Sequence, residues 1–176
     1  DAILSRGLGD VYKRQVMWDE IFDEISQDYR DVNTDKMLVD AMTTRMVLDP
    51  KSIDTVVASN LHADILTDLA ASLSGSMGIA PTGNLDPEKR HPSMFEPIHG
   101  SAFDIMGKGI ANPIGSYWSA VMMLENLGEL KAAQKLMSAI EKLTSDKKYL
   151  PKDLGGKSTT KQITKAMIDI ISGKNS

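Results

Sequence analysis

Residues 59–69 read SNLHADILTDL and carry the clearest structural signal in the sequence. The apolar positions of this stretch and its continuation recur at helical spacing: Leu61, Ile65, Leu66, Leu69, Ala70 and Leu73. That spacing predicts an amphipathic helix, which Asn60 can cap and which ends by Gly75. The run just before it, residues 53–59 (IDTVVAS), is short and rich in β-branched side chains, so it is predicted to form a buried strand.

Helical spacing recurs on both sides of this stretch. Four further helices are predicted: one from Trp18, one from Leu38 to before Pro50, one from Asn112-Pro113 to Leu127-Gly128, and one over 130–143. A last helix opens with the capping box Thr159-x-x-Gln162 and carries Ile163, Met167, Ile170 and Ile171 on one face. Between Gly78 and Pro97 the Gly- and Pro-containing sequence predicts turns and a surface loop. Helices outnumber the few buried strands, which indicates a mixed α/β architecture.

Composition narrows the classes of function. The 176 residues include 41% hydrophobic and 25% charged side chains, as in one globular domain or two partial ones. The net charge is -4 without a Lys/Arg run, which argues against nucleic acid as a partner. The absence of cysteine excludes disulfides, thiolate nucleophiles and Cys-bound zinc. No apolar stretch approaches the roughly 18 residues that span a bilayer, so we expect no membrane association and a cytoplasmic location.

The beginning of the chain differs from the rest. It starts at Asp1 without a methionine, and residues 5–15 show neither helical nor strand periodicity. We interpret residues 1–15 as a non-native lead segment, with a flexible native segment as the alternative.

Three aspartates are candidate metal ligands. Asp64 and Asp68 are four residues apart on the predicted helix, so their carboxylates project from one face and could share a cation such as Mg²⁺ or Mn²⁺. A solvated helix face is the alternative explanation. Asp40 interrupts the otherwise apolar stretch LVDAM (residues 38–42) and needs a partner if it is buried.

A second constellation is MFEPIHGSAFDI at residues 94–105, followed by Gly107, Gly109 and Asn112. A strand running into a glycine-rich turn would place backbone N–H groups, His99 and Asp104 around one rim. Such a rim could hold a nucleotide, with Asp104 accepting hydrogen bonds from ribose hydroxyls. The alternative is a structural loop in which His99 bonds backbone carbonyls, since the Gly-x-Gly-x-x-Gly fingerprint after a strand is absent.

Four ordered motifs carry a resemblance to a known family: LVDAM at 38–42, SNLHADILTDL at 59–69, FEPIHGSA at 95–102 and GKGIANP at 107–113. From about Val16 to its end the chain resembles the isocitrate/isopropylmalate dehydrogenase family. The sequence around Trp18, Phe103 and Trp118 most resembles its tartrate and D-malate dehydrogenase branch.

The resemblance implies roles for specific residues. Asp64 and Asp68 match the pair that binds Mg²⁺ or Mn²⁺ in its own subunit, and Asp40 matches the aspartate that reaches the neighbouring subunit's metal and substrate. The cofactor loop that holds the adenosine half of NAD is matched by His99, Gly100, Ser101, Ala102, Asp104 and Asn112. An acidic Asp104 followed by Ile105 resembles the NAD-selecting pattern, since a 2′-phosphate would meet a carboxylate there.

The family fold implied is two α/β domains around a cleft. Residues 16–77 would belong to the smaller, dimer-forming domain and residues 78–176 to the larger, cofactor-binding domain. The family's substrate-binding arginines, catalytic tyrosine and catalytic lysine would lie before Trp18, so we assign no catalytic residue to this C-terminal half and expect it to be inactive alone.

The implied activity is NAD-dependent, metal-assisted oxidative decarboxylation of a malate-like or tartrate-like 2-hydroxy acid by a homodimer. Three alternatives stay open: 3-isopropylmalate dehydrogenase, a non-catalytic regulatory subunit of the same family, and a helical binding module without a cofactor.

Overall fold

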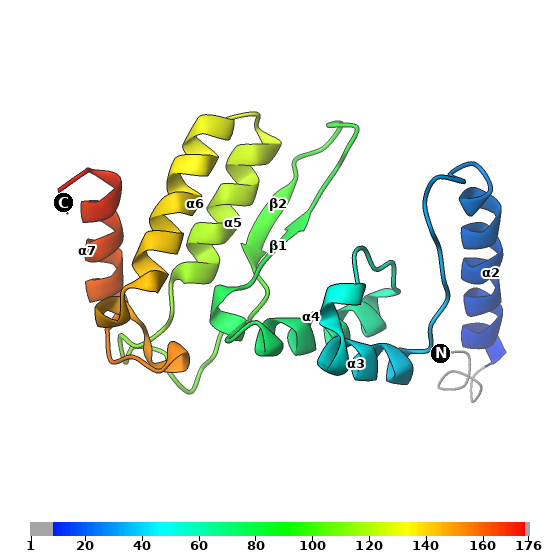
Figure 1. The fold of residues 1–176 in the computed structure, drawn as a ribbon, viewed down its shortest axis with the longest axis horizontal. Coiled ribbons are helices and arrows are strands. Elements are labelled where there is room, and N and C mark those ends of the chain that lie inside the picture. The colour runs from blue at the N-terminus through cyan, green and yellow to red at the C-terminus, as the bar shows by residue number, and fades with distance from the viewer. Residues whose placement is uncertain (1–8, 175–176) are drawn as a thin grey trace. The chain divides into compact units, whose positions relative to one another are not determined.

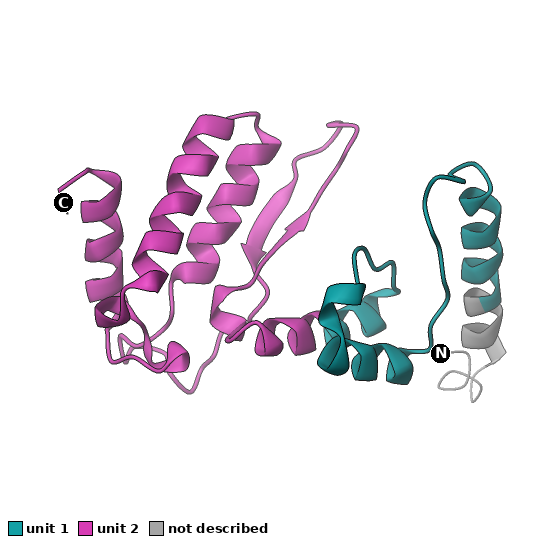
Figure 2. Ribbon diagram, viewed as in Figure 1, with its two compact units in different colours: residues 1–66 teal, residues 67–176 magenta. Residues whose placement is uncertain are grey.

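The structure is a computed structural model that describes residues 9–174. It divides into two compact units, residues 1–66 and 67–176, which Figure 2 colours separately. The division falls within helix α4 (Asn60–Leu73). The domain boundary expected after residue 77 stays a prediction, and residues 1–8 of the predicted lead segment lie outside the described residues.

The first unit contains helices α2 (Gly9–Ser26) and α3 (Val39–Leu48) and the short 3₁₀ helix η1 (Pro50–Ser52). Helix α2 begins at Gly9, although the sequence of residues 9–15 shows no helical periodicity. Apolar periodicity was a poor guide there because helix formation does not require it. Lys13, Arg14 and Gln15 all have high intrinsic helix propensity, and no proline interrupts the helix.

Helix α3 ends before Pro50, as the sequence predicted. Its last turn is tied to η1 by Arg45, whose Nη2 donates to the Ser52 carbonyl and whose Nε donates to Ser52 Oγ, both at 2.8 Å. Arg45 also forms an ion pair with Asp35 at 3.3 Å. The guanidinium therefore holds three neighbouring segments of this unit together.

The segment between η1 and α4 is extended but is not a strand, so the predicted strand at 53–59 was wrong. Val56 and Val57 remain 39% and 65% exposed. A β-branched run becomes a strand only where a neighbouring strand accepts and donates its backbone hydrogen bonds, and no such neighbour pairs with it among residues 9–174.

The second unit is built on a β-hairpin and three helices. Strand β1 (Pro81–Asn84) pairs antiparallel with β2 (Met94–Pro97), with Pro81 opposite Pro97 and Asn84 opposite Met94. The sequence predicted turns over this region, and β1 was missed because a four-residue strand containing Pro and Gly shows no alternation. Helix α5 (Ile114–Asn126) packs on the hairpin, α6 (Leu130–Ser145) packs on α5, and α7 (Thr160–Ile171) packs on α6 (Figure 1).

The hydrophobic core lies between these three helices. It consists of Ile114, Val121, Ala133, Ala139, Ile140, Leu143, Ile163, Ala166 and Met167. The apolar face predicted for α7 is confirmed, and so is the helix predicted over 130–143, although Leu130 at the start of α6 is 65% exposed. The Thr159–Gln162 capping box of α7 is also confirmed. Among residues 9–174, none of the helices is long and apolar enough to cross a membrane.

Two of the four isoleucines of α7 provide a matched test of this core. Ile163 is fully buried, whereas Ile168 on the same helix is 57% exposed. We predict that Ile163→Ala lowers the free energy of unfolding by about 2–5 kcal/mol, because the truncation leaves a cavity between α6 and α7. Ile168→Ala should change it by less than about 0.5 kcal/mol. Urea denaturation followed by circular dichroism measures both, and equal losses in the two variants would contradict the assignment of the core.

Candidate functional site

The aspartate pair lies on α4, as predicted. Asp64 and Asp68 are one helical turn apart on this helix, and both residues are exposed. Two exposed carboxylates in this arrangement offer the hard oxygen ligands that Mg²⁺ and Mn²⁺ prefer.

Asp40 lies in the first turn of α3 and is also exposed. Its Oδ1 accepts a hydrogen bond from the backbone N–H of Ala41 at 2.8 Å, and its carbonyl accepts one from Thr43 Oγ1 at 2.7 Å. The apolar sequence around Asp40 suggested that the carboxylate would need a partner if it were buried. Asp40 is exposed to solvent in the described chain, so this condition is not met.

The three aspartates do not form a complete metal site within one chain. In the part of the chain that the structure describes, no group of three or more His, Cys, Asp or Glu side chains could hold a metal ion. The donor chemistry fits a hard divalent cation, but a cation at Asp64 and Asp68 would need further ligands from water, substrate or a second subunit. Assignment of Asp40, Asp64 and Asp68 to one metal therefore stays a prediction.

The glycine-rich segment between β2 and α5 forms an exposed loop, residues 98–112, whose two ends are held firmly. At its start, the N–H of Ile98 donates to the carbonyl of Ala80 at 3.1 Å, next to the hairpin. At its end, the backbone N–H of Thr160 donates to the carbonyl of Gly109 at 2.9 Å, and Thr160 Oγ1 donates to the carbonyl of Ala111. The loop is thus presented by the hairpin on one side and by the start of α7 on the other.

Within this loop the backbone turns sharply at three positions with positive φ: Ala102 at 44°, Gly107 at 74° and Gly109 at 67°. A Cβ added at Gly100, Gly107 or Gly109 would meet no atom within 4 Å. These glycines therefore border open space, as a loop that receives a ligand against its backbone requires.

The predicted cofactor residues are brought together on this loop. His99, Gly100, Ser101, Ala102 and Asp104 are all exposed. His99 Nδ1 lies 3.0 Å from the carbonyl of Gly100, the backbone contact expected of a structural loop. The carboxylate of Asp104 offers acceptors that fit ribose hydroxyls, so the residues present suit the adenosine half of a dinucleotide.

The last predicted residue, Asn112, is half-buried and differs from the others. Its Oδ1 accepts a hydrogen bond at 2.9 Å from the N–H of Ile114, the first residue of α5, whose N-cap position is occupied by Pro113. Its Nδ2 donates to Asp153 Oδ2 at 2.8 Å.

Asp153 is a residue that the sequence reasoning missed. It lies in the short helix η4 (Lys152–Leu154), and its Oδ2 also accepts a hydrogen bond from Ser76 Oγ. Ser76 Oγ in turn accepts from the N–H of Gly78 at 2.9 Å, at the start of η2 (Met77–Ile79). We call Ser76, Asn112 and Asp153 the carboxylate hub. No local pattern could reveal it, because its members are 41 and 77 residues apart.

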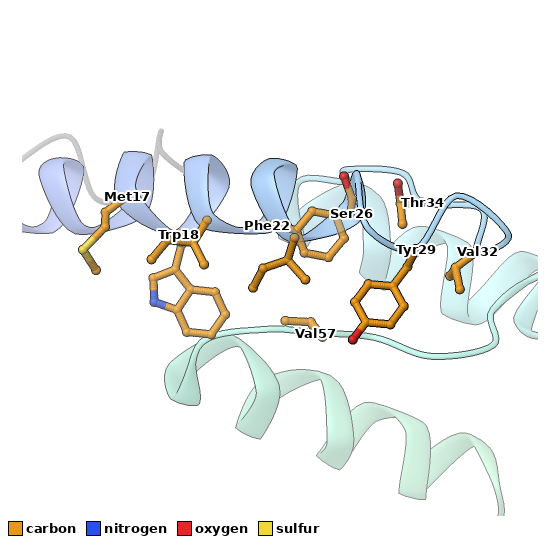
Figure 3. Close-up of a pocket in the computed structure, with 10 residues that line it drawn as sticks. Met17, Trp18, Phe22, Ser26, Tyr29, Val32, Thr34 and Val57 are labelled. Atoms are coloured by element: carbon orange, nitrogen blue, oxygen red, sulfur yellow. The ribbon is translucent and has the colours of Figure 1, made fainter.

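An apolar groove of about 530 Å³ lies in the first unit, and none of the predicted site residues lines it. Figure 3 shows Trp18 and Phe22 of α2, and Tyr29 of the turn that follows the helix, on the side of Val57 of the extended segment. The lining is completed by Met17, Ile21, Ile25, Ser26, Val32 and Thr34. Because it offers no carboxylate, amine or imidazole, the groove has the chemistry of a packing surface and lacks that of a catalytic site.

Comparison with known proteins relates these features to a family. The model of the isocitrate/isopropylmalate dehydrogenase family matches residues 6–171. A relative from Agrobacterium vitis, named as a probable tartrate dehydrogenase/decarboxylase, is 61% identical over 160 residues, which are 91% of this chain and 44% of the relative. The decarboxylating D-malate dehydrogenase of Escherichia coli strain K12 is 43% identical over 88% of this chain and 44% of its own length.

Solved structures agree with this relationship. The isocitrate dehydrogenase from Methylococcus capsulatus is 34% identical and superposes with a TM-score of 0.84 over 97% of this chain and 48% of its own. The chain thus spans about half the length of the proteins that it matches. On the family match and these identities, the chain belongs to the isocitrate/isopropylmalate dehydrogenase family.

Proposed function

We propose that this chain supplies the metal-binding and cofactor-binding part of an NAD-dependent decarboxylating dehydrogenase that acts on a malate-like or tartrate-like 2-hydroxy acid. The observation that carries the proposal is the 61% identity to the relative named as a tartrate dehydrogenase/decarboxylase. The 43% identity to a D-malate dehydrogenase supports the same substrate class, since malate and tartrate are both 2-hydroxy dicarboxylic acids.

The proposed metal ligands are Asp64 and Asp68 of one subunit together with Asp40 of a second copy. The exposure of all three carboxylates supports this arrangement, because each is accessible to a cation or to another chain. When bound, Mg²⁺ or Mn²⁺ supplies Lewis-acid polarisation of the substrate oxygens. The aspartates contribute the negative charge that offsets the dehydration of the ion and fix its position relative to the hydroxy acid.

The proposed cofactor site is the exposed loop between β2 and α5. Its glycines leave space for a ligand to approach the backbone, and Asp104 offers a carboxylate to ribose hydroxyls. The same carboxylate would repel a 2′-phosphate, so we propose that the loop selects NAD over NADP.

Acid–base groups are left unassigned in this proposal. The resemblance would place the family's catalytic tyrosine, lysine and substrate-binding arginines outside this chain. A 3-isopropylmalate dehydrogenase is the alternative within the enzyme class, and a regulatory subunit is the alternative outside it. The retained acidic pair on α4 favours a metal-using enzyme over a regulatory subunit.

The activity is tested by following NADH formation with Mn²⁺ and either D-malate, tartrate or 3-isopropylmalate. The 176-residue chain alone should show no turnover, because losing acid–base catalysis alone lowers the rate by about 10²–10⁴-fold. An intact protein containing this chain should oxidise D-malate or tartrate faster than 3-isopropylmalate. A preference for 3-isopropylmalate would support the alternative enzyme, and turnover by the chain alone would show that the missing groups are not needed.

The metal assignment predicts a loss of affinity on removing one carboxylate charge. In the intact protein, Asp64→Asn and Asp68→Asn should each weaken Mn²⁺ binding by at least about tenfold, since a neutral amide no longer offsets the dehydration of the cation. Asp54→Asn, at an exposed position before α4, is the control and should leave binding unchanged. Calorimetry measures all three, and unchanged affinity in both helix variants would refute the assignment.

The cofactor assignment predicts a change in preference. Asp104→Lys combined with Ile105→Tyr should raise the affinity ratio of NADP to NAD by about tenfold or more, because a repulsive carboxylate is replaced by an attractive ammonium group. Glu141→Lys, at an exposed position on α6, changes the net charge equally and should leave the ratio unaltered. Equal affinity of the unaltered protein for NAD and NADP would contradict the proposed role of Asp104.

A further inference from the structure

We propose that Asp153 is a positioning residue for the cofactor loop: its carboxylate fixes the orientation of the Asn112 side-chain amide, which then presents its remaining hydrogen-bonding groups to the adenine of a dinucleotide. The inference rests on the proposed cofactor site. The observation behind it is the carboxylate hub, in which one oxygen of Asp153 accepts from both Asn112 Nδ2 and Ser76 Oγ.

The hub determines which way the Asn112 amide faces. A carboxylate can only accept hydrogen bonds, so the amide nitrogen of Asn112 must face Asp153. A backbone N–H can only donate them, so the amide oxygen must face Ile114. Rotation of the amide by 180° would break both hydrogen bonds and place like groups against each other. The orientation is therefore set by the chain itself before any ligand binds.

The fixed amide keeps unused capacity. Asn112 Nδ2 has a second N–H, and its oxygen has a second lone pair. An asparagine recognises adenine through one donor and one acceptor. Its amide oxygen accepts from the adenine amino group, and its amide nitrogen donates to an adenine ring nitrogen. A purine is therefore a chemically suitable ligand for the groups that the hub leaves open.

The hub also connects the end of the loop to the chain before β1. Ser76 is bound to Gly78 through the Gly78 N–H, and a Cβ at Gly78 would lie only 2.7 Å from Asp153 Oδ2. The glycine therefore allows the carboxylate to approach. As a result, Asn112 is held from two directions: by α5 through Ile114, and by Asp153, which is itself held by Ser76.

The test compares ligands and variants of the 176-residue chain by calorimetry, with NAD, AMP and nicotinamide mononucleotide as probes. Asp153→Ala should weaken binding of NAD and AMP by about tenfold, because an Asn112 amide that is no longer held in place loses about one hydrogen bond to adenine. Asn112→Ala should do the same, and the double variant should lose no more than either single variant. Affinity for nicotinamide mononucleotide, which lacks adenosine, should not change.

Two matched variants separate positioning from general stability. Asp153→Asn keeps an acceptor oxygen at the same place and should retain affinity for NAD within about threefold. Ser76→Ala removes the other hydrogen bond of the hub while leaving Asn112 and Asp153 in contact, and should weaken affinity for NAD less than Asp153→Ala does. Equal losses in Asp153→Ala and Ser76→Ala would overturn the proposal, because they would indicate a purely structural hub.

A spectroscopic measurement covers the case in which Asp153→Ala fails to fold. The side-chain amide resonance of Asn112, identified by its absence in Asn112→Ala, should shift in Asp153→Asn as the acceptor loses its charge, and an unshifted resonance would overturn the proposal. Unchanged NAD affinity in a folded Asp153→Ala variant would refute the positioning role alone. Failure of the unaltered chain to bind both NAD and AMP would refute the proposed cofactor site, and this inference with it.

Discussion

The close packing of α5 against the hairpin is the contact on which the second unit depends. Gly115, at the start of α5, is buried, and a Cβ there would lie 3.0 Å from the Gly78 carbonyl oxygen and 3.3 Å from Pro97 Cβ. An added side chain would require the helix, η2 or β2 to shift by a few tenths of an ångström. Because the loop at 98–112 leaves from β2 and returns to α5, this one contact fixes the separation of its two ends.

A helix was predictable from sequence where local patterns stabilise it. α6 and α7 bury one continuous apolar stripe, so their spacing was visible, and the Thr159 capping box is a purely local pattern. β1 was not predictable because its place depends on β2 and α5. The run at 53–59 was wrongly predicted as a strand. Its β-branched residues favour a sheet, but no strand pairs with it in the described chain.

The candidate site was likewise only partly predictable from sequence. Asp64, Asp68 and the residues from His99 to Asp104 were found because each set lies on one short stretch of chain. Asp153 was missed because nothing in its own neighbourhood marks it, and its importance arises only from contacts with distant segments. The two units also differ in how they bury apolar surface: the second has a defined core, whereas the face of α2 around Trp18 and Phe22 lines an open groove.

The double anchoring of the loop at 98–112 has an evolutionary consequence. Hydrogen bonds at Ile98, Gly109 and Ala111 hold its ends on the hairpin and α7, while most of the residues between them are exposed. Lengthening such a closed loop is inexpensive in conformational entropy, about 0.6 kcal/mol for each doubling of its length. Insertions and substitutions between the anchors can therefore occur without unfolding the core. Ligand preference can then change in evolution with little effect on folding stability.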